Sequence, residues 1–141
     1  MRCLGLDLGS KTLGIAISDR TNLIASVYKT IFFKDEDYSS LIEPLREIIV
    51  KEEIGVLVLG FPKNMNNSLG TRALITLEFK EMLEKEFSLP VYMEDERLTS
   101  VISNNVLISA NISRNKRKKK VDGMAAEIIL QGYLDRTRKE N

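Results

Sequence analysis

The chain has 141 residues, about the length of one domain, and its 43% hydrophobic and 29% charged residues argue against disordered and fibrous classes. It has no histidine and a single cysteine, Cys3, which excludes Ser-His and Cys-His catalysis, His-ligated zinc and an internal disulfide. The first residues lack the apolar core of a signal peptide, and no apolar run is long enough to span a membrane. We therefore expect one cytoplasmic domain over residues 1–141, with Cys3 as a buried thiol rather than a catalytic one.

The first part of the chain predicts three strands. Residues 2–9 and 12–19 are apolar runs joined by a tight turn at Ser10 and Lys11, and residues 23–33 form a third run. Because the connections between these runs are short, we expect an antiparallel meander.

The rest of the chain predicts helices alternating with strands. Apolar residues recur at helical spacing in residues 38–53, 71–87, 99–110 and 121–138, and short apolar runs predict strands at 56–60 and 90–93. Asp37 or Ser39 would cap the helix over 38–53, and Pro44 is tolerated only near its first turn. This order of elements describes a mixed α/β sheet with helices on its faces.

One carboxylate, Asp7, lies inside the first apolar run, where a charge is costly unless it is paired or coordinated. Period-two alternation gives Asp7 only small neighbours on its own face, which are Cys3, Gly5 and Gly9. Asp7 could instead cap a turn or pair with Lys11, and the strand alone leaves these interpretations about even. The glycines favour a bound ligand, because glycine in a strand often marks a close approach.

Further acidic residues follow in the second half of the chain. Glu94, Asp95 and Glu96 come where the strand at 90–93 ends, which is the end where open α/β sheets bind ligands. Asp95 and Glu96 could instead favour the N-terminus of the next helix. Asp122 continues the apolar stripe of the last predicted helix and should face the sheet, with an N-cap role as the alternative.

Three acids that point inward would repel one another unless cations neutralise them. Oxygen ligands select Mg²⁺ or Mn²⁺, and two such ions can support phosphodiester hydrolysis without a histidine. We therefore interpret Asp7 as a metal ligand.

A basic loop is predicted directly before Asp122. Six of the seven residues from Arg114 to Lys120 are basic, and they would bind phosphates with strong salt dependence and little sequence preference. Such a run is more often a solvated loop, but here it adjoins an inferred acidic site. The residues predicted to contact nucleic acid are Lys11, Lys63, Asn64, Arg72, Arg97, Arg114, Lys116, Arg117, Lys118, Lys119 and Lys120.

Four segments at fitting spacing, LGLDLGSKTLGIAISD, GFPKNMNNSLGTRA, DERLTS and VDGMAAEIILQGYL, together resemble the YqgF (RuvX) family of bacterial nucleases, also called Holliday junction resolvases. The resemblance implies an RNase H-like fold, with three antiparallel strands, two parallel ones and helices on both faces. It implies a metal-dependent nuclease that processes the 5′ end of precursor 16S rRNA, using two Mg²⁺ or Mn²⁺ ions. By position, the catalytic acids would be Asp7, Glu96 and Asp122, with Asp95 as a reserve ligand.

Three other functions stay open at this point. The substrate could be branched DNA, or the protein could hold structured RNA or branched DNA without cleaving it. The segment DLGSKTLG also resembles the phosphate loop of actin-like ATPases and sugar kinases, but that class needs two lobes and this chain supplies one. A junction resolvase would normally present two active sites by symmetry, so we expect either a monomer or a weak homodimer.

Overall fold

The computed structural model describes residues 1–141 apart from 10, 35–36, 62–70, 96–113 and 141; at 71, 95, 114–123 and 138–140 it describes the backbone alone. Five strands form one sheet in the order β3-β2-β1-β4-β5. Their bounds are β1 Arg2–Leu8, β2 Thr12–Ser18, β3 Ala25–Phe32, β4 Ile54–Phe61 and β5 Val91–Asp95. The pairs β1–β2 and β2–β3 are antiparallel, whereas β1–β4 and β4–β5 are parallel. The predicted mixed sheet is confirmed.

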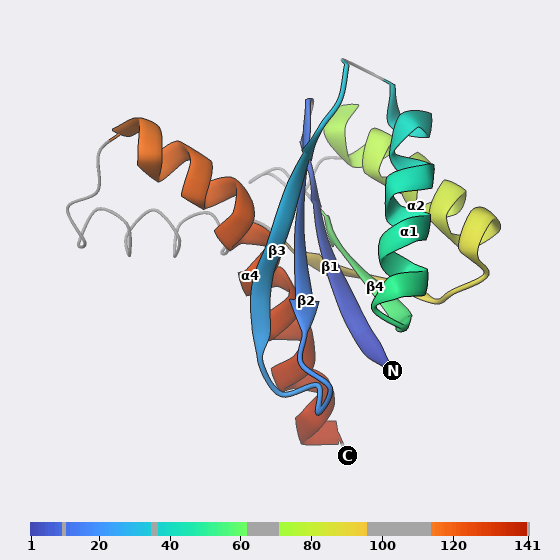
Figure 1. Ribbon diagram of the computed structural model, residues 1–141, viewed down its shortest axis with the longest axis vertical. Coiled ribbons are helices and arrows are strands. Elements are labelled where there is room, and N and C mark those ends of the chain that lie inside the picture. The colour runs from blue at the N-terminus through green and yellow to red at the C-terminus, as the bar shows by residue number, and fades with distance from the viewer. Residues whose placement is uncertain (10, 35–36, 62–70, 96–113, 141) are drawn as a thin grey trace.

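Helices cover both faces of this sheet (Figure 1). A short 3₁₀ helix, η1 (Tyr38–Leu41), leads into α1 (Ile42–Lys51), and α1 and α2 (Thr71–Phe87) lie on one face. Helix α4 (Arg114–Glu140) lies on the other face. None of the described helices has a stretch long and apolar enough to cross a membrane.

Strand alternation divides the core into two clusters. Leu4 and Leu6 of β1 point toward α1 and α2, where Leu45 and Phe79 are also fully buried. Cys3 of β1 belongs to the second cluster, which lies under α4 and includes residues from four strands. The side chains under α4 are smaller, so this helix can approach the sheet closely.

The start of the helix predicted over 38–53 differs from expectation. The chain enters this region through η1, so Ser39 lies inside the 3₁₀ turn and Asp37 makes no side-chain cap hydrogen bond. The Asp37 carboxylate instead accepts a hydrogen bond from the Ser39 hydroxyl at 3.2 Å. The predicted cap is therefore wrong, whereas Pro44 lies in the first turn of α1, as its missing N–H requires.

The start of the last helix also differs from expectation. Helix α4 begins at Arg114, so the basic run is helical and not a loop, and Asp122 lies inside the helix rather than at its N-cap. Lysine and arginine have high helix propensity, which explains why the helix extends through them. In Figure 1 the first turns of α4 project away from the sheet and the remainder lies along it. The helix predicted over 99–110 lies outside the described residues.

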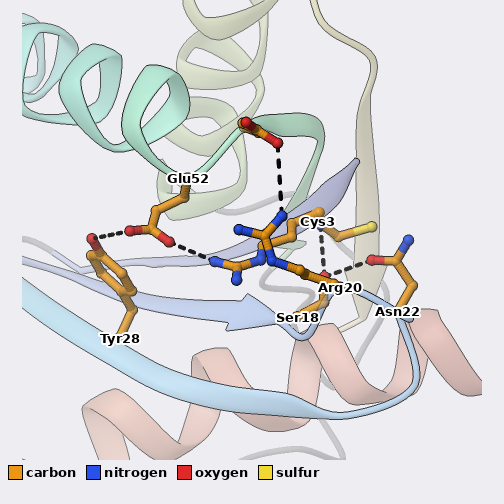
Figure 2. A network of polar contacts seen from close by, with 8 residues as sticks. Cys3, Ser18, Arg20, Asn22, Tyr28 and Glu52 are labelled. Atoms are coloured by element: carbon orange, nitrogen blue, oxygen red, sulfur yellow. Dashed lines mark hydrogen bonds and ion pairs between the residues drawn. The ribbon is translucent and has the colours of Figure 1, made fainter.

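A polar network fastens the end of the sheet where β1 begins (Figure 2). The Ser18 hydroxyl accepts a hydrogen bond from the backbone N–H of Cys3 at 2.8 Å and donates one to the Asn22 side-chain oxygen at 2.7 Å. The Arg2 guanidinium forms a 2.5 Å ion pair with Glu52. Both sets of contacts link neighbouring segments, which is consistent with a structural role at the opposite end of β1 from Asp7.

Two glycine substitutions should have opposite effects on stability. A Cβ at Gly5 would lie 2.7 Å from Leu130 Cβ and 3.0 Å from the Ala126 carbonyl oxygen, so Gly5→Ala should lower the free energy of unfolding by about 1–3 kcal/mol. Gly132 lies inside α4, where a Cβ would make only a 4.0 Å contact with Glu94 Oε2. Gly132→Ala should therefore raise the free energy of unfolding by about 0.5–1 kcal/mol. Urea denaturation of both variants checks this, and equal effects would contradict the packing described here.

Candidate active site

Asp7 lies near the end of β1, between glycines on both neighbouring strands. Its partner on β2 is Gly14, and on β4 the residue after Leu59, the partner of Leu6, is Gly60. Paired residues in a sheet point to the same face, so neither neighbouring strand puts a side chain beside the Asp7 carboxylate. The sequence reading found the glycines along β1 but missed these two, because cross-strand neighbours depend on register.

The Asp7 side chain is half-buried. Within the described part of the chain, its carboxylate accepts no hydrogen bond and forms no ion pair, and Lys11 is exposed without contacting it. The turn after β1 is closed by a backbone bond from Gly9 N–H to the Thr12 carbonyl at 2.7 Å, which needs no cap from Asp7. Among the described residues, neither a turn cap nor a lysine pair engages Asp7, and a half-buried carboxylate flanked by glycines suits a hard divalent cation.

Helix α4 runs antiparallel to β1 across this face. Gly5 lies against Ala126 and Leu130, whereas Cys3, nearer the start of β1, shares a cluster with Leu134. The predicted stripe of α4 is confirmed where its side chains are described, since Ala125, Ala126 and Ile129 are buried and Tyr133 packs against the same cluster. Leu130 and Leu134 are also buried and were missed, because the stripe is wider than the one predicted.

The other predicted ligands lie partly or wholly outside the described residues. Asp122 is placed by its backbone in α4, and Asp95 by its backbone as the last residue of β5, opposite Phe61. Glu96 follows directly in the sequence, outside the described residues. Among the described side chains, no cluster of three possible metal-binding residues is present.

The predicted nucleic-acid contacts are placed to different extents. The residues of the basic run, Arg114, Lys116, Arg117, Lys118, Lys119 and Lys120, are placed in α4 by their backbone. Lys63, Asn64 and Arg97 lie outside the described residues.

Arg72 takes a position that the sequence did not indicate. It lies in the first turn of α2, and its guanidinium donates a hydrogen bond to the backbone carbonyl of Leu8. Leu8 follows Asp7 and is the last residue of β1, beyond the residues of β1 whose register with β4 runs from Arg2 to Leu6. Arg72 therefore holds the strand end that carries Asp7.

Glu94 belongs to the acidic run but is already paired. Its carboxylate forms an ion pair with the Arg136 guanidinium of α4, and its side chain is only 15% exposed. Glu94 pairs with Gly60 across β4 and β5, so it lies in the same row of the sheet as Asp7. The sequence did not predict the ion pair of Arg136 with Glu94, because the two residues lie on elements far apart in the chain.

Cys3 has the features of a packing residue. It is buried in the cluster under α4, and burial raises the pKa of its thiol. A raised pKa leaves little thiolate, so the expectation of an unreactive core thiol is consistent with its surroundings.

Comparison with known proteins gives the family. A family model described as "RuvX: Holliday junction resolvase" matches residues 1–136. A relative from Geobacillus sp. (strain WCH70) is 50% identical over 135 residues, covering 96% of this chain and 98% of its own. Another relative, from Clostridium kluyveri, is 49% identical over 139 residues, covering 99% of this chain and 100% of its own. Both carry the name "Putative pre-16S rRNA nuclease".

The fold agrees with this family. The structure of Thermus thermophilus RuvC in complex with a Holliday junction substrate superposes with a TM-score of 0.61, covering 97% of this chain and 96% of that chain. At 13% identity this likeness concerns the fold alone. Because half of the aligned residues are shared with relatives along nearly the whole chain, and the sheet has the expected order, this chain belongs to the RuvX (YqgF) family of nucleases with an RNase H-like fold.

Proposed function

We propose that this protein is a metal-dependent nuclease of the cytoplasm that cleaves phosphodiester bonds during 5′-end processing of precursor 16S rRNA. The observation that carries the proposal is the Asp7 carboxylate, half-buried between glycines and free of any protein partner among the described residues. The names of the relatives from Geobacillus and Clostridium support the choice of substrate.

Asp7, Glu96 and Asp122 would hold Mg²⁺ or Mn²⁺, with Asp95 in reserve. Asp122 lies one helical turn before Ala126, in the direction in which β1 continues from Gly5 to Asp7. Aspartate followed by glycine is unfavourable inside a helix, where glycine alone costs about 1 kcal/mol relative to alanine. A functional reason for Asp122 and Gly123 would explain why α4 keeps them.

Two bound ions would supply an activated water and stabilise the leaving oxygen. The residues of the chain do the rest. Gly14 and Gly60 leave room beside Asp7 for a phosphate group, and Arg72 keeps the end of β1 in place. The cationic first turns of α4 attract the nucleic-acid backbone.

The description of the family favours branched DNA as a second candidate substrate. A monomer would suit trimming of RNA, whereas two-fold symmetric cleavage of a junction needs two active sites, as a weak homodimer would supply. Cleavage assays should therefore include a labelled precursor rRNA leader and a four-way DNA junction.

Replacing Asp7 tests the metal site. Asp7→Asn keeps the size of the side chain but removes its charge, so cleavage should fall about a thousandfold or more while substrate binding persists. Labelled-substrate assays with Mg²⁺, with Mn²⁺ and with chelator measure this, and Asp37→Asn, the same change at an exposed position, is the control. Cleavage that survives in Asp7→Asn would show that the metal assignment is wrong.

Replacing Arg72 tests the support of β1. Arg72→Gln removes the charged donor to the Leu8 carbonyl, so the cleavage rate should fall about 10- to 100-fold, as for residues that orient metal ligands. Arg20→Gln, at an exposed position in the β2–β3 turn, is the control and should cleave normally. A normal rate in Arg72→Gln would mean that β1 holds its end without this bond.

Replacing lysines of α4 tests the phosphate contacts. Lys118, Lys119 and Lys120 changed together to Ala should weaken binding and flatten its salt dependence, by about 0.7–0.9 units of log–log slope for each lost phosphate contact. Alanine preserves helix propensity, so α4 should remain helical. The matched control changes three exposed lysines elsewhere, Lys29, Lys34 and Lys51. Equal salt slopes for the two triple variants would reduce the basic run to a solvated surface.

A further inference from the structure

The edge of the sheet at β5 carries a pair of stacked aromatic rings, of which the outer residue is exposed. Tyr92 of β5 and Tyr133 of α4 lie with their ring centroids 5.5 Å apart and their planes 23° apart. Tyr133 is half-buried and burial raises the pKa of its hydroxyl, whereas Tyr92 is 46% exposed. The inner ring thus anchors the outer ring, and Tyr92 is nearly half exposed, which packing alone does not require.

A fixed cation accompanies this pair. The Arg136 guanidinium lies 5.9 Å from the Tyr133 ring centroid, and its side chain is 53% exposed. The ion pair with the mostly buried Glu94 holds Arg136 in this position. An exposed ring and an oriented guanidinium therefore lie together on one small surface, which we call the Tyr92 platform (Tyr92, Tyr133 and Arg136).

The Tyr92 platform lies on the same face of the sheet as Asp7. Tyr92 pairs with Val58 and Glu94 with Gly60, and Asp7 is in the row of Gly60. Two strand spacings separate Glu94 from Asp7, which is about 10 Å. The platform is therefore within reach of a nucleic-acid strand that passes Asp7.

The chemistry of the platform fits a nucleotide. Aromatic side chains stack on bases of any sequence, and guanidinium groups pair with phosphates. Stacking of this kind needs a base that is not paired in a duplex. A single-stranded segment of RNA satisfies both requirements.

We propose that Tyr92, Tyr133 and Arg136 form a subsite for an unpaired nucleotide of the RNA substrate, whose base stacks on Tyr92 and whose phosphate contacts Arg136. This inference rests on the proposed nuclease function. It deepens that function by proposing that single-stranded RNA reaches the site along β5. It adds contacts that lie outside both the acidic residues and the basic run.

The absence of tryptophan from the chain allows a direct test. In an Asp7→Asn background with chelator, Tyr92→Trp places the only tryptophan of the chain on the platform, excited selectively over the tyrosines, and the probe is a single-stranded oligoadenylate RNA. Stacking should quench the fluorescence, and a duplex RNA of equal length should not. Phe32→Trp, 76% exposed on β3 at the other edge, is the matched control and should be insensitive. No quenching at residue 92, or equal quenching by the duplex, would overturn the proposal.

Affinity measurements separate stacking from simple packing. Tyr92→Leu keeps apolar bulk but has no aromatic face, so single-strand affinity should fall roughly tenfold, whereas Tyr92→Phe should bind normally. Equal affinities of the Leu and Phe variants, with equal melting temperatures, would overturn the subsite.

The phosphate contact is tested by changing both partners of the ion pair. Arg136→Gln with Glu94→Gln avoids an unpaired buried charge and should lower the salt slope for single-strand binding by about one unit. An unchanged slope would remove Arg136 from the proposal. None of these binding measurements depends on cleavage, so failure of the subsite and failure of the nuclease assignment give different results.

Discussion

The close approach of α4 to β1 is the constraint on which the rest of the structure depends. Gly5 lies directly against Ala126 and Leu130, and any larger residue there would push the helix away from the sheet. Interiors pack at crystal-like density, so such a shift cannot be absorbed locally. The same contact sets the position of α4 along β1. It therefore also sets how far along β1 the backbone of Asp122 lies, one helical turn before Ala126.

The polar groups at the two ends of β1 differ in how they are paired. Where β1 begins, the Ser18 hydroxyl bonds to Cys3 and Asn22, and Arg2 pairs with Glu52. Where β1 ends, Asp7 lies between glycines and has no protein partner among the described residues.

Much of the fold was predictable because it rests on local periodicity. The short connections after β1 and β2 indicated an antiparallel meander, and the apolar runs of β4 and β5 lie within a few residues of their predicted bounds. The start of α4 was wrong, because helix propensity of lysine and arginine outweighed the loop character of a charged run. The cap at Asp37 was wrong, because a 3₁₀ turn precedes α1.

The sequence by itself determined that Asp7 is a charge in a buried strand, that its neighbours on the same face of that strand are small, and that a second group of acids follows the strand before residue 96. These features depend on residue type and on the period of a strand or helix, which are local. Only the tertiary structure decided that Gly14 flanks Asp7, that Arg72 holds the Leu8 carbonyl, and that Arg136 neutralises Glu94. Each of these contacts joins segments far apart in the chain, and no local preference specifies which segments meet.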